Sequence, residues 1–187
     1  MTIATLKQDI ASWLDREDLT EYIPRFIAFG ANRIYRTART VANERVVSGT
    51  ATGGVFEIPA DLVQVRYVAV GGRALEATNA VNALSSLSGL PESFTRIGDK
   101  IYLFPAQTSE IIMDYYFSES VANDSDNPAL YQVAPDLFLY ASLIEASSFL
   151  ENDNRLSVWE RKYAQAFSDL KTLSDDADLF NVGSIKS

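Results

Sequence analysis

The side chains that most often carry out catalysis or bind metals are missing from this chain. Its 187 residues contain no cysteine and no histidine. Thiol nucleophiles, disulfides, the usual zinc ligands and histidine-based catalytic triads are therefore excluded. Acid–base chemistry would fall to Asp, Glu, Lys and Tyr alone. The composition predicts no catalytic residue, no cofactor and no metal, and favours a protein that is not an enzyme.

The acidic loop at residues 124–127 is a candidate for a metal site with oxygen ligands. Its sequence, Asp-Ser-Asp-Asn, is similar to the first positions of a calcium-binding EF-hand loop. In that loop Ala129 would stand where glycine is required, and Pro135 where the bidentate glutamate is required. These two mismatches predict a solvated turn.

Three arginines recur at every third position, Arg33, Arg36 and Arg39. Two interpretations fit this spacing. The arginines could neutralise the negative end of their own helix, or they could form salt bridges with a neighbouring subunit. In the second case, the predicted acidic partners are Glu145, Glu151, Asp153 and Glu160.

Two other functions compete with a structural role. A carboxylate-based hydrolase acting on cell-wall glycan would need two carboxylates facing a cleft, roughly 5–9.5 Å apart. The chain contains 25 Asp and Glu residues, and no pair of them is marked by its sequence context. A monomeric peptide-binding module that uses the edge of a sheet is the second alternative.

Helical periodicity dominates both ends of the chain. A short amphipathic helix is predicted over residues 3–14, and a second helix from Asp18 to about residue 40, with Glu21 as the capping-box partner of Asp18. A third helix, at 134–150, is apolar on nearly all sides and must be buried, against the chain's own core or against a neighbour. A fourth carries one apolar stripe, formed by Trp159, Tyr163, Phe167 and Leu170.

Between these helices the period changes to that of strands. One hairpin is predicted around Gly53-Gly54 and another around Gly98-Asp99. Residues 79–88 are compatible with a short helix or an irregular crossing. The predicted strands cover residues 45–50, 55–58, 62–70, 73–76, 94–97, 100–104 and 111–117.

These elements predict an α+β fold, in which a helical bundle of about four helices carries an inserted small antiparallel β-domain. The predicted parts are an N-terminal helical pair at 1–43, the β-domain at 44–118, a C-terminal helical pair at 119–173 and an extended tail at 174–187.

The order of several segments resembles the head-to-tail adaptor proteins of short-tailed bacteriophages. The third helix continues through residues 151–155 into the helix that carries Trp159. Upstream, in matching order, stand Ile-Pro-Ala-Asp-Leu at 58–62, Gly-Leu-Pro-Glu-Ser-Phe-Thr at 89–95 and Leu-Phe-Pro-Ala at 103–106. The resemblance covers roughly residues 3–173.

The resemblance implies a homo-oligomeric ring, typically dodecameric, that docks beneath the portal protein and joins the DNA-filled capsid to the tail. Its further partner would be a tail nozzle or tail tube protein, and DNA would pass through without specific binding. Family members dock C-terminal segments against the portal, which implies that role for four apolar tail residues, namely Leu179, Phe180, Val182 and Ile185.

The net charge of −9 is concentrated in one part of the chain, because residues 109–187 hold 14 Asp or Glu against five Arg or Lys. Such a surface repels phosphates. It suits a wall that DNA slides past, and it also serves solubility alone.

No run of about 18 apolar residues occurs, and residues 1–10 lack the basic and apolar blocks of a secretory signal. We therefore expect synthesis in the host cytoplasm and no membrane contact.

Overall fold

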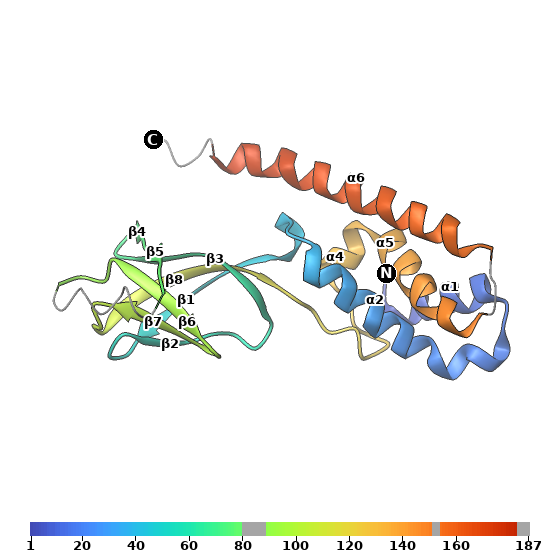
Figure 1. Cartoon of the computed structure of the whole chain (residues 1–187), viewed down its shortest axis with the longest axis horizontal. Helices are drawn as coiled ribbons and strands as arrows, with labels where there is room; N and C mark the ends of the chain where they lie inside the picture. The colour runs from blue at the N-terminus through green and yellow to red at the C-terminus, as the bar shows by residue number, and fades with distance from the viewer. Residues whose placement is uncertain (80–88, 151–153, 183–187) are drawn as a thin grey trace. The chain divides into compact units, whose positions relative to one another are not determined.

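The computed structural model describes residues 1–79, 89–150 and 154–182. The chain divides into a helical unit, Met1–Asn43 with Ser118–Ser187, and a β unit, Glu44–Phe117 (Figure 1). The predicted α+β class is confirmed. Apart from Asn79, the segment predicted at 79–88 falls outside the described residues.

Helix α5 (Pro135–Ala146) is the centre of the helical unit. The helices α1 (Ile3–Leu14), α2 (Ile23–Thr37), α4 (Ala129–Val133) and α6 (Leu156–Val182) all pack against it. The apolar third helix predicted from the sequence is therefore covered by the chain's own helices. Its buried residues are Leu137, Phe138, Ala141, Ser142, Leu143, Ile144 and Ala146.

The backbones of α2 and α5 approach each other closely at Gly30. A Cβ atom added to Gly30 would lie 2.9 Å from the backbone nitrogen of Ser142 and 3.1 Å from Cβ of Ala141. Only glycine fits at this crossing, and small residues on α5 are needed to meet it.

The start of the second helix differs from the prediction. Residues Glu17–Tyr22 form the 3₁₀ helix η1, and α2 begins only at Ile23. Asp18 accepts a hydrogen bond from Arg16 Nε at 2.7 Å and does not cap the α-helix. Pro24 explains the shift, because proline fits the first turn of an α-helix, where its missing N–H has no partner to lose.

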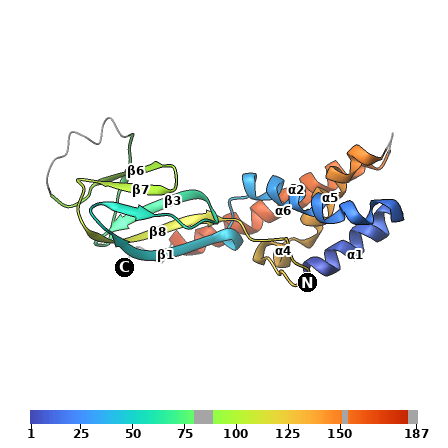
Figure 2. The same ribbon diagram turned by 90° about the horizontal axis from the view of Figure 1, so that it is seen from below.

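Two four-stranded sheets form the β unit, as two layers (Figure 2). One has the order β1 (Glu44–Ala51), β8 (Ser109–Phe117), β3 (Leu62–Val70), β4 (Arg73–Ala74). The other has the order β2 (Val55–Glu57), β7 (Lys100–Phe104), β6 (Ser93–Ile97), β5 (Glu76–Ala77). The β5–β6 pair is parallel, and the other strand pairs are antiparallel. The core of this unit is formed by Ala51, Val68, Leu75, Phe94, Ile101, Leu103, Ile111, Met113, Tyr115 and Phe117.

One predicted hairpin is confirmed, and the other is limited to a tight turn closed by a single antiparallel bridge between Thr52 and Val55. Strands β6 and β7 pair across a turn in which Gly98 has φ +63°. The chain also turns at Gly53-Gly54, but β1 then pairs with β8, and β2 pairs with β7 in the other sheet. A Cβ at Gly54 would lie 2.7 Å from Cα of Ala106. This glycine therefore allows the tight turn at which the chain crosses from one sheet to the other.

The extended tail predicted at 174–187 is wrong for residues 174–182, because α6 continues to Val182. No Gly or Pro interrupts the sequence from Leu156 to Val182. Leu170 and Ser174, one turn apart, are both buried and hold this part of the helix against the unit. The helix can therefore continue through a polar stretch that lacks an apolar stripe of its own.

Two short 3₁₀ helices complete the helical unit: η2 (Val41–Asn43) follows α2, and η3 (Ser147–Phe149) follows α5. Asn43 Oδ1 accepts hydrogen bonds from the backbone nitrogen of Thr40 at 3.1 Å and from its hydroxyl at 2.8 Å. Both residues are buried. This arrangement fixes the chain where it leaves α2 and positions the residues of η2.

Candidate functional site

The predicted interface arginines lie in and just after the last turns of α2. Arg33 donates from Nε to Glu145 Oε1 on α5 at 2.8 Å, so this ion pair forms within one chain. Arg36 donates to the carbonyl of Asn32 at 3.0 Å. Arg39 donates to carbonyl oxygens at the end of α2, the shortest of these bonds being 2.7 Å. Arg39 therefore neutralises the carbonyl end of its own helix.

The acidic partners predicted for these arginines are separated. Glu145 pairs with Arg33, and Glu160 is exposed on α6. Glu151 and Asp153 lie outside the described residues. Salt bridges from this set to a second copy stay a prediction.

The predicted portal-binding residues lie at the end of the chain. The backbone of Leu179, Phe180 and Val182 belongs to α6, and Ile185 lies outside the described residues. The role of these four residues in portal binding stays a prediction.

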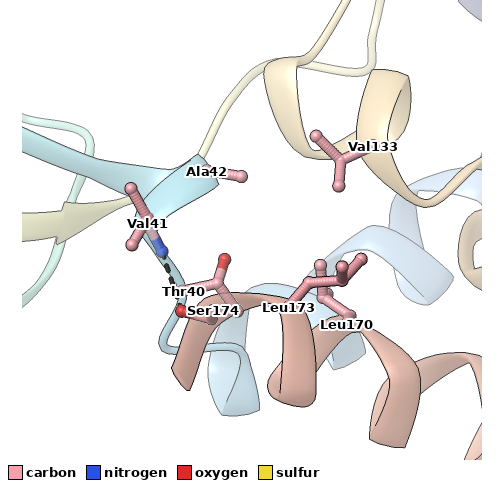
Figure 3. Close-up of a pocket in the computed structure, with 7 residues that line it drawn as sticks. All are labelled: Thr40, Val41, Ala42, Val133, Leu170, Leu173 and Ser174. Carbon is pink, nitrogen blue, oxygen red and sulfur yellow. Dashed lines mark hydrogen bonds between the residues drawn. The ribbon is translucent and has the colours of Figure 1, made fainter. Parts of the chain in front are cut away.

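The helical unit contains a pocket of about 280 Å³ beside α6, which we call the α6 pocket (Figure 3). A hydrogen bond of 3.1 Å from the backbone nitrogen of Val41 to Ser174 Oγ closes one end of it. This volume suits one or two side chains and is below the range of most small-molecule sites. The pocket is lined by Thr40, Val41, Ala42, Val133, Leu170, Leu173 and Ser174.

The rim of the α6 pocket is aliphatic and open to solvent. Leu173 is 61% exposed, Val133 51% and Val41 37%. Leu170 and Thr40, by contrast, are buried. Three exposed aliphatic side chains around one hollow are a feature of surfaces that receive a partner's apolar side chain.

A second exposed apolar surface, here called the aromatic surface, consists of Tyr22, Phe29 and Phe149. These side chains are 42%, 44% and 44% exposed. The ring centres of Tyr22 and Phe149 are 5.2 Å apart. The guanidinium of Arg25 lies over the Phe29 ring, 5.3 Å from its centre. The aromatic surface therefore projects from η1, α2 and η3, with a cation beside it.

Two neighbouring carboxyl groups, the partly buried Glu44 and the buried Asp114, lie on β1 and β8 of the β unit. Arg66 on β3 forms ion pairs with both, the one to Asp114 at 3.5 Å. One oxygen of each carboxyl group, Glu44 Oε2 and Asp114 Oδ1, is buried with no hydrogen-bond partner in the described structure. Burial, and after it the neighbouring Glu44 carboxylate, raise the pKa of Asp114 to about 6. A proton is therefore taken up here in mildly acidic solution.

The acidic loop at 124–127 forms a turn in the part of the chain that the structure describes. The described residues bring together no group of three or more acidic side chains able to hold a metal ion. Asp126 of the acidic loop accepts hydrogen bonds from Ser120 Oγ at 2.7 Å and from the backbone nitrogen of Asn123 at 3.0 Å, as in a turn. None of the described helices is long and apolar enough to cross a bilayer.

Sequence reasoning missed both the α6 pocket and the aromatic surface. The pocket combines residues around positions 41, 133 and 173, which no local motif connects. Phe29 had a detectable signal, because it lies on the side of α2 opposite the apolar stripe of Phe26, Gly30 and Ile34.

The exposed apolar surfaces are typical of a protein that makes contacts with other proteins. The chain matches the SU10 adaptor protein family over residues 1–184. It belongs to this family, and is a structural adaptor of a bacteriophage. The resemblance predicted from the sequence is confirmed. A comparison with curated proteins found no match.

Proposed function

We propose that this adaptor forms a ring, typically dodecameric, that docks beneath the portal protein and joins the DNA-filled capsid to the tail. In this role it is a component of the virion at the head-to-tail junction. It meets the portal on one side and a tail nozzle or tail tube protein on the other. The observation that carries the proposal is the family match over residues 1–184.

The exposed surfaces of the helical unit support assembly. A protein that stays alone seldom leaves several large apolar side chains around one hollow open to water. The aliphatic rim around the α6 pocket and the aromatic surface are two such places within one unit. A ring of copies provides partners for surfaces of this kind without open-ended growth.

Charge supports the passage of DNA through the ring. The net charge of −9 gives the chain a surface that repels phosphate. DNA that must move rapidly during ejection gains from a wall to which it does not bind. The C-terminal residues Leu179, Phe180, Val182 and Ile185 are the proposed portal contacts.

A phage in which the gene for this protein carries an early stop codon provides the test. DNA-filled heads without tails should accumulate, and supplying the full chain from a plasmid should restore tailed particles. Heads that acquire tails normally without the protein would contradict the proposal. A phage with a stop codon in a tail-fibre gene is the control, because it should still join heads to tails.

A further inference from the structure

Helix α2 exposes a basic and aromatic stripe along one side. Tyr22, Phe29 and Arg36 follow one another at intervals of seven residues, which is about two helical turns, so they share this side. Arg25 lies over Phe29 on the same stripe. From Ile23 to Thr37 the helix contains three arginines and no acidic residue. Because Arg33 is paired with Glu145, the positive charge of this side comes from Arg25 and Arg36, which stand beside the projecting aromatic rings.

The second half of α6 has the opposite character. Within residues 165–175, Asp169 and Asp175 are exposed beside one lysine, Lys171. Asp169 and Leu173 are one turn apart, so the acidic side chain adjoins the aliphatic rim of the α6 pocket. Both are exposed. An acidic helix beside an apolar hollow complements the α2 stripe in charge and in shape.

Within one copy these two surfaces do not cover each other. Tyr22 and Phe29 remain more than 40% exposed, and so do Leu173 and Val133. No residue that lines the pocket belongs to α2. Each surface is therefore available to a second molecule, and the two differ, as a head-to-tail contact requires.

We propose that the aromatic surface of one copy seats against the α6 pocket of the next copy, forming the repeated contact of the ring. Phe29 is the anchor that enters the pocket. Arg25 and Arg36 lie against the acidic half of the neighbour's α6. This inference rests on the proposed ring and assigns the residues of its interface.

Physical reasons favour a second copy over another partner. A hollow of about 280 Å³ accepts an aromatic side chain. Aromatic residues and arginine are the most frequent anchors of protein interfaces. Opposite charges on two helices of the same chain attract neighbouring copies in one direction and repel the reversed arrangement, in which like surfaces meet. The contact therefore gives a ring its direction as well as its affinity.

The absence of cysteine from the chain permits a direct test. Two single-cysteine variants are made, Asn32→Cys beside Phe29 on the stripe and Ala42→Cys in the α6 pocket. They are mixed in equal amounts, assembled on portal particles and treated with a short bismaleimide. The expected result is an efficiently cross-linked dimer in the mixture and none with either variant alone. Gln8→Cys, exposed on α1, replaces Asn32→Cys in the control mixture.

Each other outcome overturns the inference in a distinguishable way. Rings that form but cross-link no better than the Gln8→Cys control refute this interface and leave the ring standing. Cross-linking of Asn32→Cys to itself indicates a two-fold contact instead. Cross-linking of Ala42→Cys to the portal assigns the pocket to that protein. If no ring forms, the proposed function itself fails. Should Ala42→Cys not fold, Leu173→Cys on the exposed rim takes its place.

Discussion

Replacing Asp114 with asparagine should stabilise the β unit at neutral pH and have little effect in acid. Asp114 is only 2% exposed, and its nearest charged neighbours are the carboxylate of Glu44 and the guanidinium of Arg66. Asparagine has nearly the same shape and carries no charge. At low pH it replaces a protonated carboxyl group of similar hydrogen-bonding capacity, whereas at neutral pH it replaces a buried anion.

The expected size of the effect follows from the pKa. Burial and Glu44 raise the pKa of Asp114 from 3.8 to about 6. Because one pKa unit corresponds to about 1.4 kcal/mol, the shift lowers the free energy of unfolding by about 3 kcal/mol once the group is ionised. The folded state binds the proton more tightly than the unfolded state. The stability that the folded state gains from this tighter proton binding is complete below about pH 4 and is lost as the pH rises through about 6.

Amide hydrogen exchange in β1, β3 and β8 measures this effect, expressed as protection relative to the intrinsic exchange rate at each pH. Tryptophan fluorescence serves as the internal control, because Trp13 and Trp159 both belong to the helical unit. The advantage of Asp114→Asn over the native chain should grow by roughly 2–3 kcal/mol between pH 4 and pH 8. A constant difference would refute the reasoning. Glu110→Gln, on the exposed side of β8, controls for net charge.

Other expected outcomes concern the helical unit and the tail. Trp159→Ala should lower the free energy of unfolding by about 3–5 kcal/mol in chemical denaturation, since Trp159 is 1% exposed; an unchanged midpoint would contradict this burial. Gly30→Ala should cost about 1–2 kcal/mol, because the clash with α5 outweighs the gain in helix propensity, and a stabilised variant would show that the helices can separate. A chain ending at Asp178 should keep its melting temperature and lose co-sedimentation with portal particles, whereas normal co-sedimentation would remove the role proposed for the last residues.

Much of the fold follows from local periodicity. The strands at 62–70 and 100–104 have the predicted bounds, because each alternates or runs apolar between clear turn residues. The central position of α5 followed from its lack of a polar side. The close approach of its small residues to Gly30 of α2 emerges only from the structure.

The differences arise where distant residues decide the structure. The turn at Gly53-Gly54 is visible in the sequence, but the partner of β1 is β8, more than fifty residues away. The helical state of residues 174–182 depends on burial of Leu170 and Ser174 against the unit, which polarity alone does not indicate. The α6 pocket depends on three separate segments and could not be found from any one of them.

Electron cryomicroscopy of the full chain mixed with its phage's portal, beside the chain alone, tests the adaptor account most directly. The account predicts a ring of this protein seated on the portal, with α2 of each copy facing α6 of the next and the C-terminal residues against the portal. A portal that remains bare while the chain stays monomeric at saturating concentration would contradict it.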